Sequence, residues 1–399
     1  MITPSYAITA TERVLPRLAL DFTTGVLDPR VTITRALNTA TRVNSSGFIE
    51  TVNADLPRFD YDRATLLPKG MLIEETRQNL VLQSANLANA TNWTPAGVGV
   101  GLTPVVTSNA GVSPTGSNDA VRIQFDCTDI ASATNRSRIT QTITIVNGTT
   151  YSRGMWIKAY DANSVGKTIR FATDSIGTNL IYTLTDQWVR INPASAAASS
   201  TSTVFTLETR GTLTTQTADV LVWSATLEAG AFLTSDIPTT TTSLTRNADA
   251  VSMTGTNFSD WYNATEGTFM VQGIPTTTAS SGALSIDDGT GNERMQMRAL
   301  GGGGQALVVD GGSTQVNLPT GTWPTGSSGK CVLAYKASSF ACAVGGDAPA
   351  TSASGTLPTV TQMQIGGGIN QSYFNGRVQK IGYWPQRCIN NEVRAFSKG

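Results

Sequence analysis

The sequence contains no histidine among its 399 residues. Histidine is the usual general base near neutral pH, and its imidazole is the commonest metal ligand in proteins. Its absence therefore excludes Ser-His-Asp and Cys-His catalytic machinery and metal sites built on imidazole.

Cysteine is scarce, with four residues in the whole chain. Cys127, Cys331, Cys342 and Cys388 have spacings unlike any zinc pair, and only Cys331 and Cys342 are near enough in sequence to be hairpin neighbours. Unpaired cysteine is among the most buried residue types. We therefore expect reduced, mostly buried thiols, with a single disulfide as the alternative.

Charge of either sign is sparse. Charged residues make up 14% of the chain, and 28 Lys and Arg balance 28 Asp and Glu. No block of five like charges occurs. Nucleic acid is therefore not an expected partner, because neutralising phosphates needs a basic face.

Long apolar runs are missing as well. The chain begins MITPSYAITATERVLP, which has neither the basic n-region nor the long apolar h-region of a signal peptide. A membrane-spanning helix needs about 20 apolar residues, and no such run occurs. We expect no signal peptide and no membrane insertion. Residues 1–17 have no clear period and are expected to order only against partner chains.

What the sequence has in abundance is glycine, serine and threonine. Glycine contributes 38 residues, and serine and threonine crowd nearly every segment. This mixture disfavours long helices and favours short strands with tight turns, so the predicted fold class is all-β. Typical domains hold about 100–200 residues, so a chain of 399 suits two or three.

The stretch 219–253 is where one folded unit ends and another begins. It opens with DVLVWSATLE, whose apolar residues follow the two-residue period of a half-buried strand. Pro238 ends that strand, and TTTTSLTRNADAVSM shows no helical period. We interpret this run as an extended connector, and limited proteolysis is expected between Pro238 and Thr254.

Three segments follow from this boundary. Residues 1–78 are predicted to form an N-terminal attachment segment with a β-ribbon, 79–240 a jelly roll of eight candidate strands, and 241–399 a second sandwich. The ribbon strands at 18–35 and 47–53 are too few to close a sheet. They predict an obligate oligomer in which several chains pair these edges around a common axis.

Two blocks of sequence resemble recurring parts of tailed-phage virion proteins. Residues 18–83, from LALDFTTG through RFDYDR to KGMLIEETRQNLVLQS, are similar to the leader of phage fibre and decoration proteins. The pattern W-x-A-x-LEAG-x-F-x-T-S-x-IPT followed by TR-x-AD is similar to a module ending of such proteins. The residues that carry this second match are Trp223, Leu227, Glu228, Ser235, Pro238, Thr245, Arg246 and Asp249.

The middle and the end of the chain carry further resemblances. The strands around RITQTITIVNGTTYSRGMWIKA resemble those of carbohydrate-binding modules, and FNGRVQKIGYWPQRCINNEVRAF is similar to the last strand and short helical tail of laminin-G-like sandwiches. The second match rests on Gly376, Val378, Ile381, Tyr383, Arg387, Ile389, Glu392 and Phe396. The leucine usual after the arginine is replaced here by Cys388-Ile389. These resemblances imply a carbohydrate-binding-type jelly roll followed by a concanavalin-A or laminin-G-like sandwich.

The phage resemblance implies a non-enzymatic virion protein, a tail or head fibre or spike that displays a host- or glycan-binding surface. Such a protein assembles in the cytoplasm of the bacterial host, contacts other virion proteins through its N-terminal segment, and is commonly a homotrimer. The alternative is a purely structural capsid decoration or cement protein. A glycan depolymerase is less favoured, because the acidic residues are scattered singly. No cofactor is expected.

Aromatic residues in loop-like sequence are the candidate glycan-binding groups. They are Trp93, Trp261, Tyr262, Trp323 and Tyr373, with Trp323 in GTWPTG as the first choice. The competing interpretation is that each ring folds back on the core. Three further tryptophans, Trp156, Trp188 and Trp223, lie on the apolar phase of strands, where core packing is favoured over a sugar platform.

Two acidic clusters suggest metal binding or catalysis. In IDDGTGNE, Asp287, Asp288 and Asn292 supply the oxygen ligands that Ca²⁺ prefers, but the spacing differs from a calcium loop and a hairpin turn is favoured. In RFDYDR, Asp60 and Asp62 lie beside two arginines. Local ion pairing in a connecting loop is favoured there over a calcium site or an acid and base pair.

Overall fold

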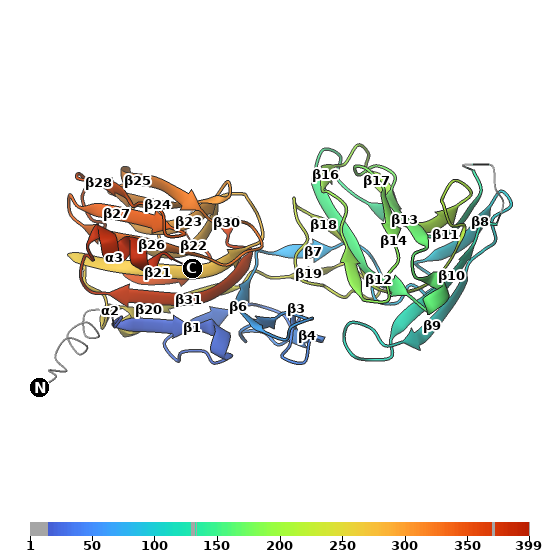
Figure 1. Ribbon diagram of the computed structural model, residues 1–399, viewed down its shortest axis with the longest axis horizontal. Coiled ribbons are helices and arrows are strands. Elements are labelled where there is room, and N and C mark those ends of the chain that lie inside the picture. Colours follow the sequence, from blue (N-terminus) through green and yellow to red (C-terminus); the bar gives the residue numbers. More distant parts are fainter. Residues whose placement is uncertain (1–14, 129–131, 133, 369–371, 399) are drawn as a thin grey trace, which may run out of the picture.

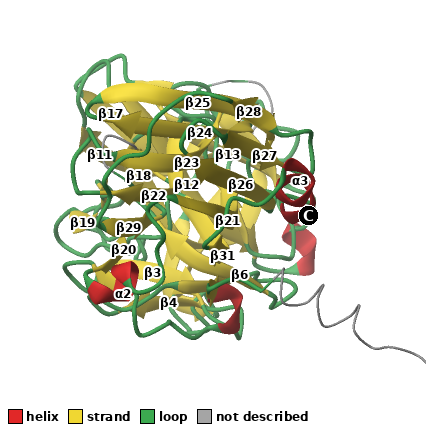
Figure 2. Cartoon of the chain, turned by 90° about the vertical axis from the view of Figure 1, so that its left-hand side faces the viewer, coloured by secondary structure: helices red, strands yellow, loops and turns green. Residues whose placement is uncertain are grey.

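The computed structural model describes residues 15–128, 132, 134–368 and 372–398, and it shows an elongated molecule with two β-sandwich lobes side by side (Figure 1). Strands make up most of the regular structure, and the helices are short (Figure 2). The predicted all-β class with two sandwiches is confirmed.

The first sheet of the C-terminal lobe has the order β28-β27-β26-β21-β31-β6-β5, and β1 also pairs with β31. Its strands are β28 (Ala350–Ser352), β27 (Phe340–Val344), β26 (Gly329–Lys336), β21 (Glu266–Pro275), β31 (Gly376–Trp384), β6 (Pro68–Ile73), β5 (Phe59–Tyr61) and β1 (Leu18–Asp21). In β21, Phe269 and Val271 face the core while Met270 and Gln272 are only partly buried, as the two-residue period of a strand requires.

The second sheet of this lobe has the order β2-β20-β29-β22-β23-β24-β25, with β30 beside β22. Its strands are β2 (Thr32–Thr34), β20 (Ala250–Thr254), β29 (Gln362–Ile365), β22 (Ser281–Asp287), β23 (Arg294–Leu300), β24 (Gly303–Asp310), β25 (Ser313–Thr322) and β30 (Ser372–Tyr373). The two sheets bury one apolar core between them, which includes Phe269, Trp323 and Tyr335.

Short helical pieces complete the C-terminal lobe. They are η1 (Phe22–Thr24), α2 (Thr256–Ser259) and α3 (Asn390–Phe396). Val393 of α3 packs with Ala334 of β26 and Ala341 of β27 in a small apolar cluster that is separate from the main core. The short helical tail that the laminin-G resemblance implies is therefore present in the structure.

The middle lobe is the second sandwich. A six-stranded sheet has the order β15-β12-β18-β10-β9, with β16 beside β12, and it faces a five-stranded sheet in the order β14-β13-β17-β11-β8. The strands of the first are β15 (Val189–Ile191), β12 (Thr150–Ala159), β18 (Thr217–Ala229), β10 (Ala120–Asp126), β9 (Val105–Gly111) and β16 (Ala196–Ala197). Those of the second are β14 (Leu180–Thr183), β13 (Thr168–Thr173), β17 (Ser202–Arg210), β11 (Arg136–Thr144) and β8 (Thr94–Val98), and η2 (Ala162–Ser164) follows β12. A core of its own lies between these sheets.

Two short strand pairs lie at the joint between the lobes. They are β7 (Arg77–Asn79) with β19 (Leu244–Arg246), and the hairpin of β3 (Ala40–Val43) with β4 (Ile49–Val52). Asn79 is fully buried, and its side-chain amide donates to the carbonyls of Ala225 and Ile237, both at 3.0 Å. The chain enters the middle lobe after β7 and leaves it before β19, and the pairing of these two strands and the buried Asn79 hold both segments together.

The expected separate N-terminal ribbon is wrong. β1 and β6 pair with β31, β5 pairs with β6, and β2 pairs with β20, so the N-terminal strands complete the two sheets of the C-terminal lobe. The middle lobe is therefore inserted between β7 and β19. The strand edges on which the oligomer prediction rested are paired within the chain: β1 and β2 pair with strands more than 200 residues away, and β4 pairs with the neighbouring β3. The part of the expected anchor at residues 1–14 lies outside the described residues.

The connector after Pro238 is extended, as predicted, but it is not loosely attached. Arg246 and Asp249 are buried, and β19 pairs with β7. Only residues 240–242 of this stretch are exposed in succession. The expected protease sensitivity up to Thr254 is inconsistent with this burial, because cleavage needs an accessible, locally unfolded backbone.

Two other expectations concern cysteine and membranes. The four cysteines are buried and form no disulfide in the described structure, and the Sγ atoms of Cys331 and Cys342 lie 3.8 Å apart on the neighbouring strands β26 and β27. Among the described residues, no helix combines the length and the apolar composition needed to cross a bilayer.

Candidate functional site at the joint between the sandwiches

A buried network of charged side chains lies at the joint, with Arg58 at its centre. Arg58 precedes β5, and its Nη1 donates to Glu74 Oε2 at 2.7 Å and to Ser235 Oγ at 2.9 Å. Its Nε and Nη2 donate to the two carboxylate oxygens of Asp249. Asp249 Oδ2, which accepts from Nη2 of Arg58, also accepts from the backbone N–H of Glu74 at 2.9 Å. Arg58 thus ties the chain before the middle lobe to the chain after it.

Two further arginines enlarge this joint network. Arg35 Nη1 donates to Asp249 Oδ1 at 2.8 Å, and Arg246 Nη1 lies 3.1 Å from Glu74 Oε2. The side chains of Arg35, Arg58 and Arg246 are all 0% exposed. Buried charges require partners of this kind, because removing an unpaired charge from water costs several kcal/mol.

The pKa values of two acids at the joint, Glu74 and Glu228, are shifted in opposite directions. Burial alone would raise the pKa of the Glu74 carboxyl, but the guanidinium groups of Arg246 and Arg58 outweigh burial and hold that pKa below its usual range. For Glu228 burial dominates, and its pKa is raised despite Arg190 and Arg246. Glu228 Oε2 accepts from the N–H and the hydroxyl of Thr234, whereas its Oε1 has no hydrogen-bond partner in the described structure.

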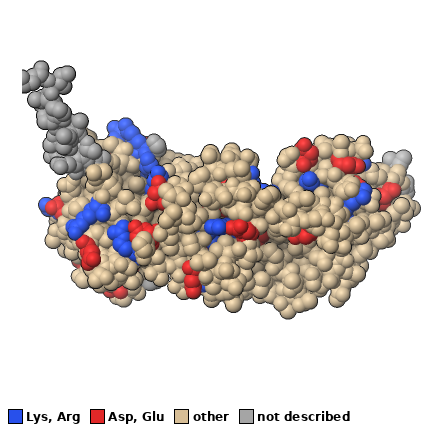
Figure 3. Space-filling model, turned by 90° about the horizontal axis from the view of Figure 1, so that it is seen from below, with Lys and Arg blue, Asp and Glu red and all other residues tan. Residues whose placement is uncertain are grey.

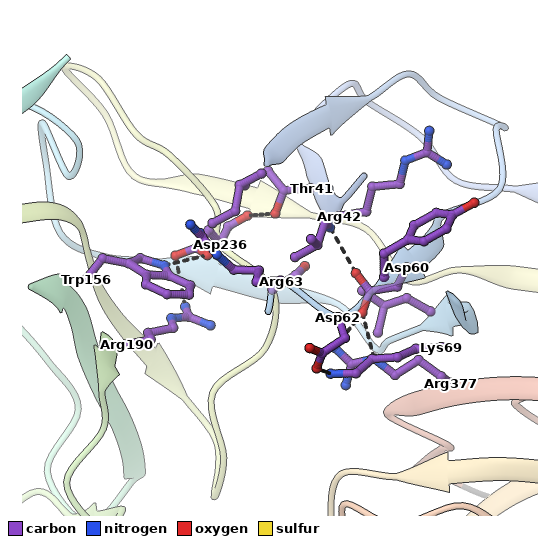
Figure 4. A pocket seen from close by; sticks show the side chains of 15 residues that line it. Thr41, Arg42, Asp60, Asp62, Arg63, Lys69, Trp156, Arg190, Asp236 and Arg377 are labelled. Carbon is purple, nitrogen blue, oxygen red and sulfur yellow. Dashed lines mark hydrogen bonds and ion pairs between the residues drawn. The ribbon is translucent and has the colours of Figure 1, made fainter. Parts of the chain in front are cut away.

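A cleft of about 290 Å³ opens beside this network, between the β3–β4 hairpin and the outer face of the six-stranded sheet (Figure 4). It draws on strands of both lobes and on the loop after β18. The lining residues are Thr41, Arg42, Val43, Ile49, Asp60, Tyr61, Asp62, Arg63, Lys69, Leu72, Trp156, Arg190, Ser235, Asp236 and Arg377.

Asp236 organises the middle-lobe side of the cleft. It accepts hydrogen bonds from Trp156 Nε1 at 3.0 Å and from Ser224 Oγ at 2.9 Å, and it lies 3.2 Å from Arg190 Nη2. Ser224 sits in β18 with a φ of 50°, at the point where the register between β12 and β18 shifts. The hydrogen bond to Asp236 helps to hold this left-handed residue, a conformation that disfavours most side chains.

Arg63 lies between the two sides of the cleft (Figure 4). Its guanidinium carbon is 4.8 Å from the centre of the Trp156 ring, and its Nη1 makes a long contact of 3.4 Å to the carbonyl of Pro114. Burial lowers the pKa of Arg63, and Asp236 only partly offsets this effect. Within the described residues Arg63 has no ion-pair partner within 4.0 Å, so it is the cation of the cleft that is free to meet a ligand.

The carboxylates on the other side of the cleft are fully engaged. Asp60 accepts from Arg377 Nε at 2.8 Å and from the N–H of Val43 at 2.9 Å, and Asp62 pairs with Lys69 at 2.9 Å. The favoured interpretation of RFDYDR as ion-paired is correct for Asp60 and Asp62, but the pairing is not local. Asp60 lies within β5, which pairs with β6, and not in a loop; its partner Arg377 is on β31, and Lys69, the partner of Asp62, is on β6.

Charge is otherwise sparse on the surface beside the joint. Seen from below, Lys and Arg groups lie next to Asp and Glu groups, with wide uncharged areas between them (Figure 3). The net formal charge of zero is thus distributed as small groups of both signs on this face.

Three of the five predicted glycan-binding aromatics are buried, and their prediction is wrong. Trp93 and Trp323 are 0% exposed and Trp261 is 3% exposed. Each indole N–H donates to a backbone carbonyl: those of Gln83, Gly273 and Asn257 respectively. These loops fold back on the cores because an indole buries a large apolar area once its N–H has an acceptor.

The other two predicted rings are partly buried. Tyr262 stacks on Phe258 with ring centroids 4.7 Å apart, and burial raises its pKa. Tyr373 lines a second pocket of about 330 Å³ beside Asp249, and burial likewise raises its pKa. Neither ring lies in the joint cleft, and the structure does not bring the five predicted rings together.

The predicted calcium ligands do not form a metal site. Asp287 is fully buried, and its carboxylate accepts from Ser285, Gly289, Gln362 and Gln364. Asp288 instead accepts from the N–H and hydroxyl of Thr290, both at 2.7 Å, in a turn. Asn292 is exposed in the same turn. No group of three or more His, Cys, Asp or Glu in the described chain could hold a metal ion.

Sequence reasoning missed the role of Trp156. Trp223 is buried, but it alternates with the core residue Val222 and lies directly opposite Trp156 rather than in the core. Trp156 is only partly buried and lines the cleft. Along β12, Met155 and Ile157 face the core, so Trp156 points outward in phase with Lys158. That alternation was a signal in the sequence. The contribution of Arg63 and Asp236 to the same cleft had no local signal, because they are far apart in the chain.

Comparisons with known proteins give distant likenesses. No protein-family model matches the chain, and no curated protein does. Among solved structures, the CBM40 of the Ruminococcus gnavus IT-sialidase bound to α2,3-sialyllactose is 16% identical with a TM-score of 0.31, covering 34% of this chain and 84% of that one. Trypanosoma rangeli sialidase in complex with 2,3-difluorosialic acid is 10% identical with a TM-score of 0.29, covering 74% of this chain and 62% of that one. Likeness at this level carries no conclusion about ligand or activity.

Proposed function

We propose that this protein is a non-enzymatic structural protein of a tailed-phage virion, a fibre or spike that displays a host- or glycan-binding surface. The observation that carries the proposal is that the two phage-like blocks interlock. Arg58 and Glu74 of the leader meet Ser235, Arg246 and Asp249 of the module ending in the joint network. Residues from both phage-like blocks therefore form the joint network together.

The joint network suits a protein that presents a surface. A buried network with charged groups from both chain crossings holds the sandwiches in one relative orientation, because rotating them would separate the buried charges. A fibre or spike needs such a fixed geometry to direct a binding face outward. A hinged enzyme would instead need a joint that opens.

The cleft is better built for binding than for hydrolysis. Glycosidases use two carboxyl groups about 5–9.5 Å apart, one of which must release or take up a proton. Asp60, Asp62 and Asp236 are each paired with a cation and accept further hydrogen bonds from the chain. Their oxygens are thus occupied by groups of the chain rather than open to a substrate.

The same cleft is the candidate glycan site. Its volume of about 290 Å³ is at the small end of ligand pockets, which suits one sugar unit. Trp156 supplies an apolar ring, and Arg63 supplies donors without an ion-pair partner in the described structure. Hydroxyl and carboxylate groups of a sugar can accept from such a guanidinium.

The direct test is binding of the full chain to bacterial cells and to an array of surface polysaccharides. Arg63→Ala and Trp156→Ala should each weaken glycan binding at least tenfold. Trp188→Ala is the matched control, because Trp188 is also a partly exposed tryptophan of the middle lobe but lies outside the cleft. Equal loss in the control, or no loss in either cleft variant, would contradict the assignment of the cleft.

A second assay separates binding from depolymerisation. Polysaccharide incubated with the protein should show no increase in reducing ends over hours. An increase that Asp60→Asn, Asp62→Asn or Asp236→Asn abolishes would establish the depolymerase alternative instead.

Location and stoichiometry need the particle itself. Cryo-electron density of virions should place the chain in a tail or head fibre, and density flat on the capsid surface would support the decoration or cement alternative. The homotrimer stays a prediction that rests on the phage resemblance, since the strands from which it was argued pair within the chain. Sedimentation of the full chain measures it directly.

A further inference from the structure

A cluster of four arginines lies on the outer face of the five-stranded sheet, away from the joint cleft. Glu208 of β17 is directly opposite Arg138 of β11 on one side and Arg170 of β13 on the other. Two residues along β17, Arg210 is opposite Arg136. Because side chains alternate between the faces of a strand, all five point to the same side, and the inward set includes Ile139, Phe171 and Leu207 of the core. We call these four arginines with Glu208 the arginine face.

The positive charge of the arginine face is only partly neutralised. Glu208 Oε1 accepts from Arg170 Nη1 and from Arg210 Nε. Among the described residues, Glu208 Oε2 has no hydrogen-bond partner although it is buried, and the same holds for the Nε atoms of Arg136 and Arg138. In the part of the chain that the structure describes, Arg136 and Arg138 form no ion pair. One carboxylate thus faces four guanidinium groups in a protein whose total charge is zero.

If the arginine face had no ligand, its arrangement would reduce the stability of the fold. Like charges on neighbouring strands repel, and a polar atom removed from water without a partner costs about 1–3 kcal/mol. Glu208 forms ion pairs with Arg170 and Arg210, whose side chains are 16% and 19% exposed. In the described structure it forms none with Arg136 or Arg138. A second anion would supply the ion-pair partner that Arg136 and Arg138 lack in the described structure. Guanidinium groups bind carboxylates through two parallel hydrogen bonds, which makes carboxylate the best-matched group.

The dimensions of the arginine face favour a small anionic unit over a nucleic acid. Neighbouring strands lie about 4.8 Å apart, so four arginines on three strands cover about 10 Å. This matches one or two acidic groups, whereas nucleic-acid binding depends on neutralising many phosphates. The row through Glu208 continues with Ala96 and Ile181 at its ends, so it offers no ring on which a base could stack.

We propose that the arginine face binds the carboxylate group of an acidic sugar unit in a glycan. The anionic character of the ligand rests on the arginines alone, and the choice of a glycan rests on the proposed function. Arg136 and Arg138 hold the carboxylate, while Glu208 keeps Arg170 and Arg210 in place beside it.

The test is a calorimetric titration of the full chain with trigalacturonate, at low and at physiological salt, with maltotriose as the neutral control. Trigalacturonate should bind and maltotriose should not bind at this face. The double variant Arg136→Ala/Arg138→Ala should weaken trigalacturonate binding at least tenfold. Arg136→Lys/Arg138→Lys keeps the charge but loses the paired donors, and it should recover only part of the affinity. Thermal unfolding of each variant reports whether it is folded.

The two proposals can fail separately. Arg63→Ala in the joint cleft should leave trigalacturonate binding at the arginine face unchanged, which distinguishes the sites. Absence of trigalacturonate binding, or binding that the folded double alanine variant retains, would overturn the arginine-face proposal whatever the result at the cleft. Tighter binding of single-stranded DNA than of trigalacturonate would overturn the choice of a glycan. Carboxylate binding to a chain that fails to bind any bacterial surface would keep the anion site and contradict the proposed function.

Discussion

At the residue scale, the joint depends on charged side chains that would each be unfavourable alone. Arg58 and Arg246 are fully buried, and they are tolerated because Glu74 and Asp249 are buried with them. Such pairs contribute little net stability compared with well-packed apolar groups, but breaking one leaves a buried charge without a partner. The joint network therefore specifies geometry more than it adds stability.

Removing the charge of Glu74 should be strongly destabilising. Glu74→Gln leaves the guanidinium groups of Arg58 and Arg246 short of one anion, and a loss of about 3–5 kcal/mol in the free energy of unfolding is expected at pH 7. Glu228→Gln is the matched control. Burial raises the pKa of Glu228, so the charged form of Glu228 is less favourable in the folded protein than that of Glu74. Urea unfolding should show little or no loss for Glu228→Gln. Equal losses of unfolding free energy in the two variants would contradict the different roles given to Glu74 and Glu228.

The same pair of acids predicts opposite dependences on pH. The folded-state pKa of Glu74 is held below its ordinary value of 4.5, so its contribution to stability is present above pH 4.5 and is lost as the pH falls. The pKa of Glu228 is raised above 4.5, so its contribution is present at low pH and is lost as the pH rises. Melting temperatures between pH 3 and 7 should therefore fall less steeply towards acid for Glu74→Gln than for the wild type, and more steeply for Glu228→Gln. Parallel curves for all three proteins would count against this explanation.

At the element scale, the N-terminal strands belong to the C-terminal lobe. β31 has β21 on one edge, and its other edge is shared by β1 and β6. Without these strands that edge would be open and the apolar groups of Leu18, Leu20 and Ile73 would be missing from the core. The lobe is therefore discontinuous in sequence, with the middle lobe inserted as a unit that has its own core.

This discontinuity predicts the outcome of two deletions. A chain that starts at Asn79 lacks β1, β2, β5 and β6, so the C-terminal lobe should lose cooperative unfolding while the middle lobe keeps it. A chain in which residues 84–238 are replaced by a short Gly-Ser linker should retain the C-terminal lobe, because Asn79 and Leu244 are directly paired. Calorimetry on both chains measures this. A C-terminal lobe that unfolds cooperatively in the first chain would show that its N-terminal strands are dispensable.

At the scale of the whole molecule, the two lobes have separate cores but a shared joint. The chain passes between them twice, at β7 and β19, and both crossings are fixed by the buried Asn79 and by the joint network. The β3–β4 hairpin contacts both lobes, since Ile49 N–H donates to the Pro114 carbonyl of the middle lobe and Val43 N–H donates to Asp60 of the C-terminal lobe. The lobes should therefore move as one body.

Small-angle X-ray scattering of the wild-type chain should fit the single two-lobed shape of Figure 1. Glu74→Gln, measured well below its melting temperature, should give a broader distribution of interatomic distances because the joint is weakened. Glu228→Gln should keep the wild-type curve. A wild-type curve that requires several lobe orientations would mean that the joint is a hinge and would weaken the proposal of a rigid fibre or spike.

The sequence by itself determined the all-β class and the extended connector after Pro238. These features are local: a two-residue period and turn residues appear within a few positions, and the motif around Arg246 and Asp249 is continuous. The tertiary structure alone decided which strands pair, which rings are buried and which charges meet. An open strand edge can be satisfied by any other strand, and the partners of β1 and β2 lie hundreds of residues away. A tryptophan in a loop can point either way until a neighbouring surface offers a carbonyl to its N–H, as Gly273 does for Trp323. The arginine face shows the same limit, because Arg138, Arg170 and Glu208 become neighbours only through the pairing of three strands.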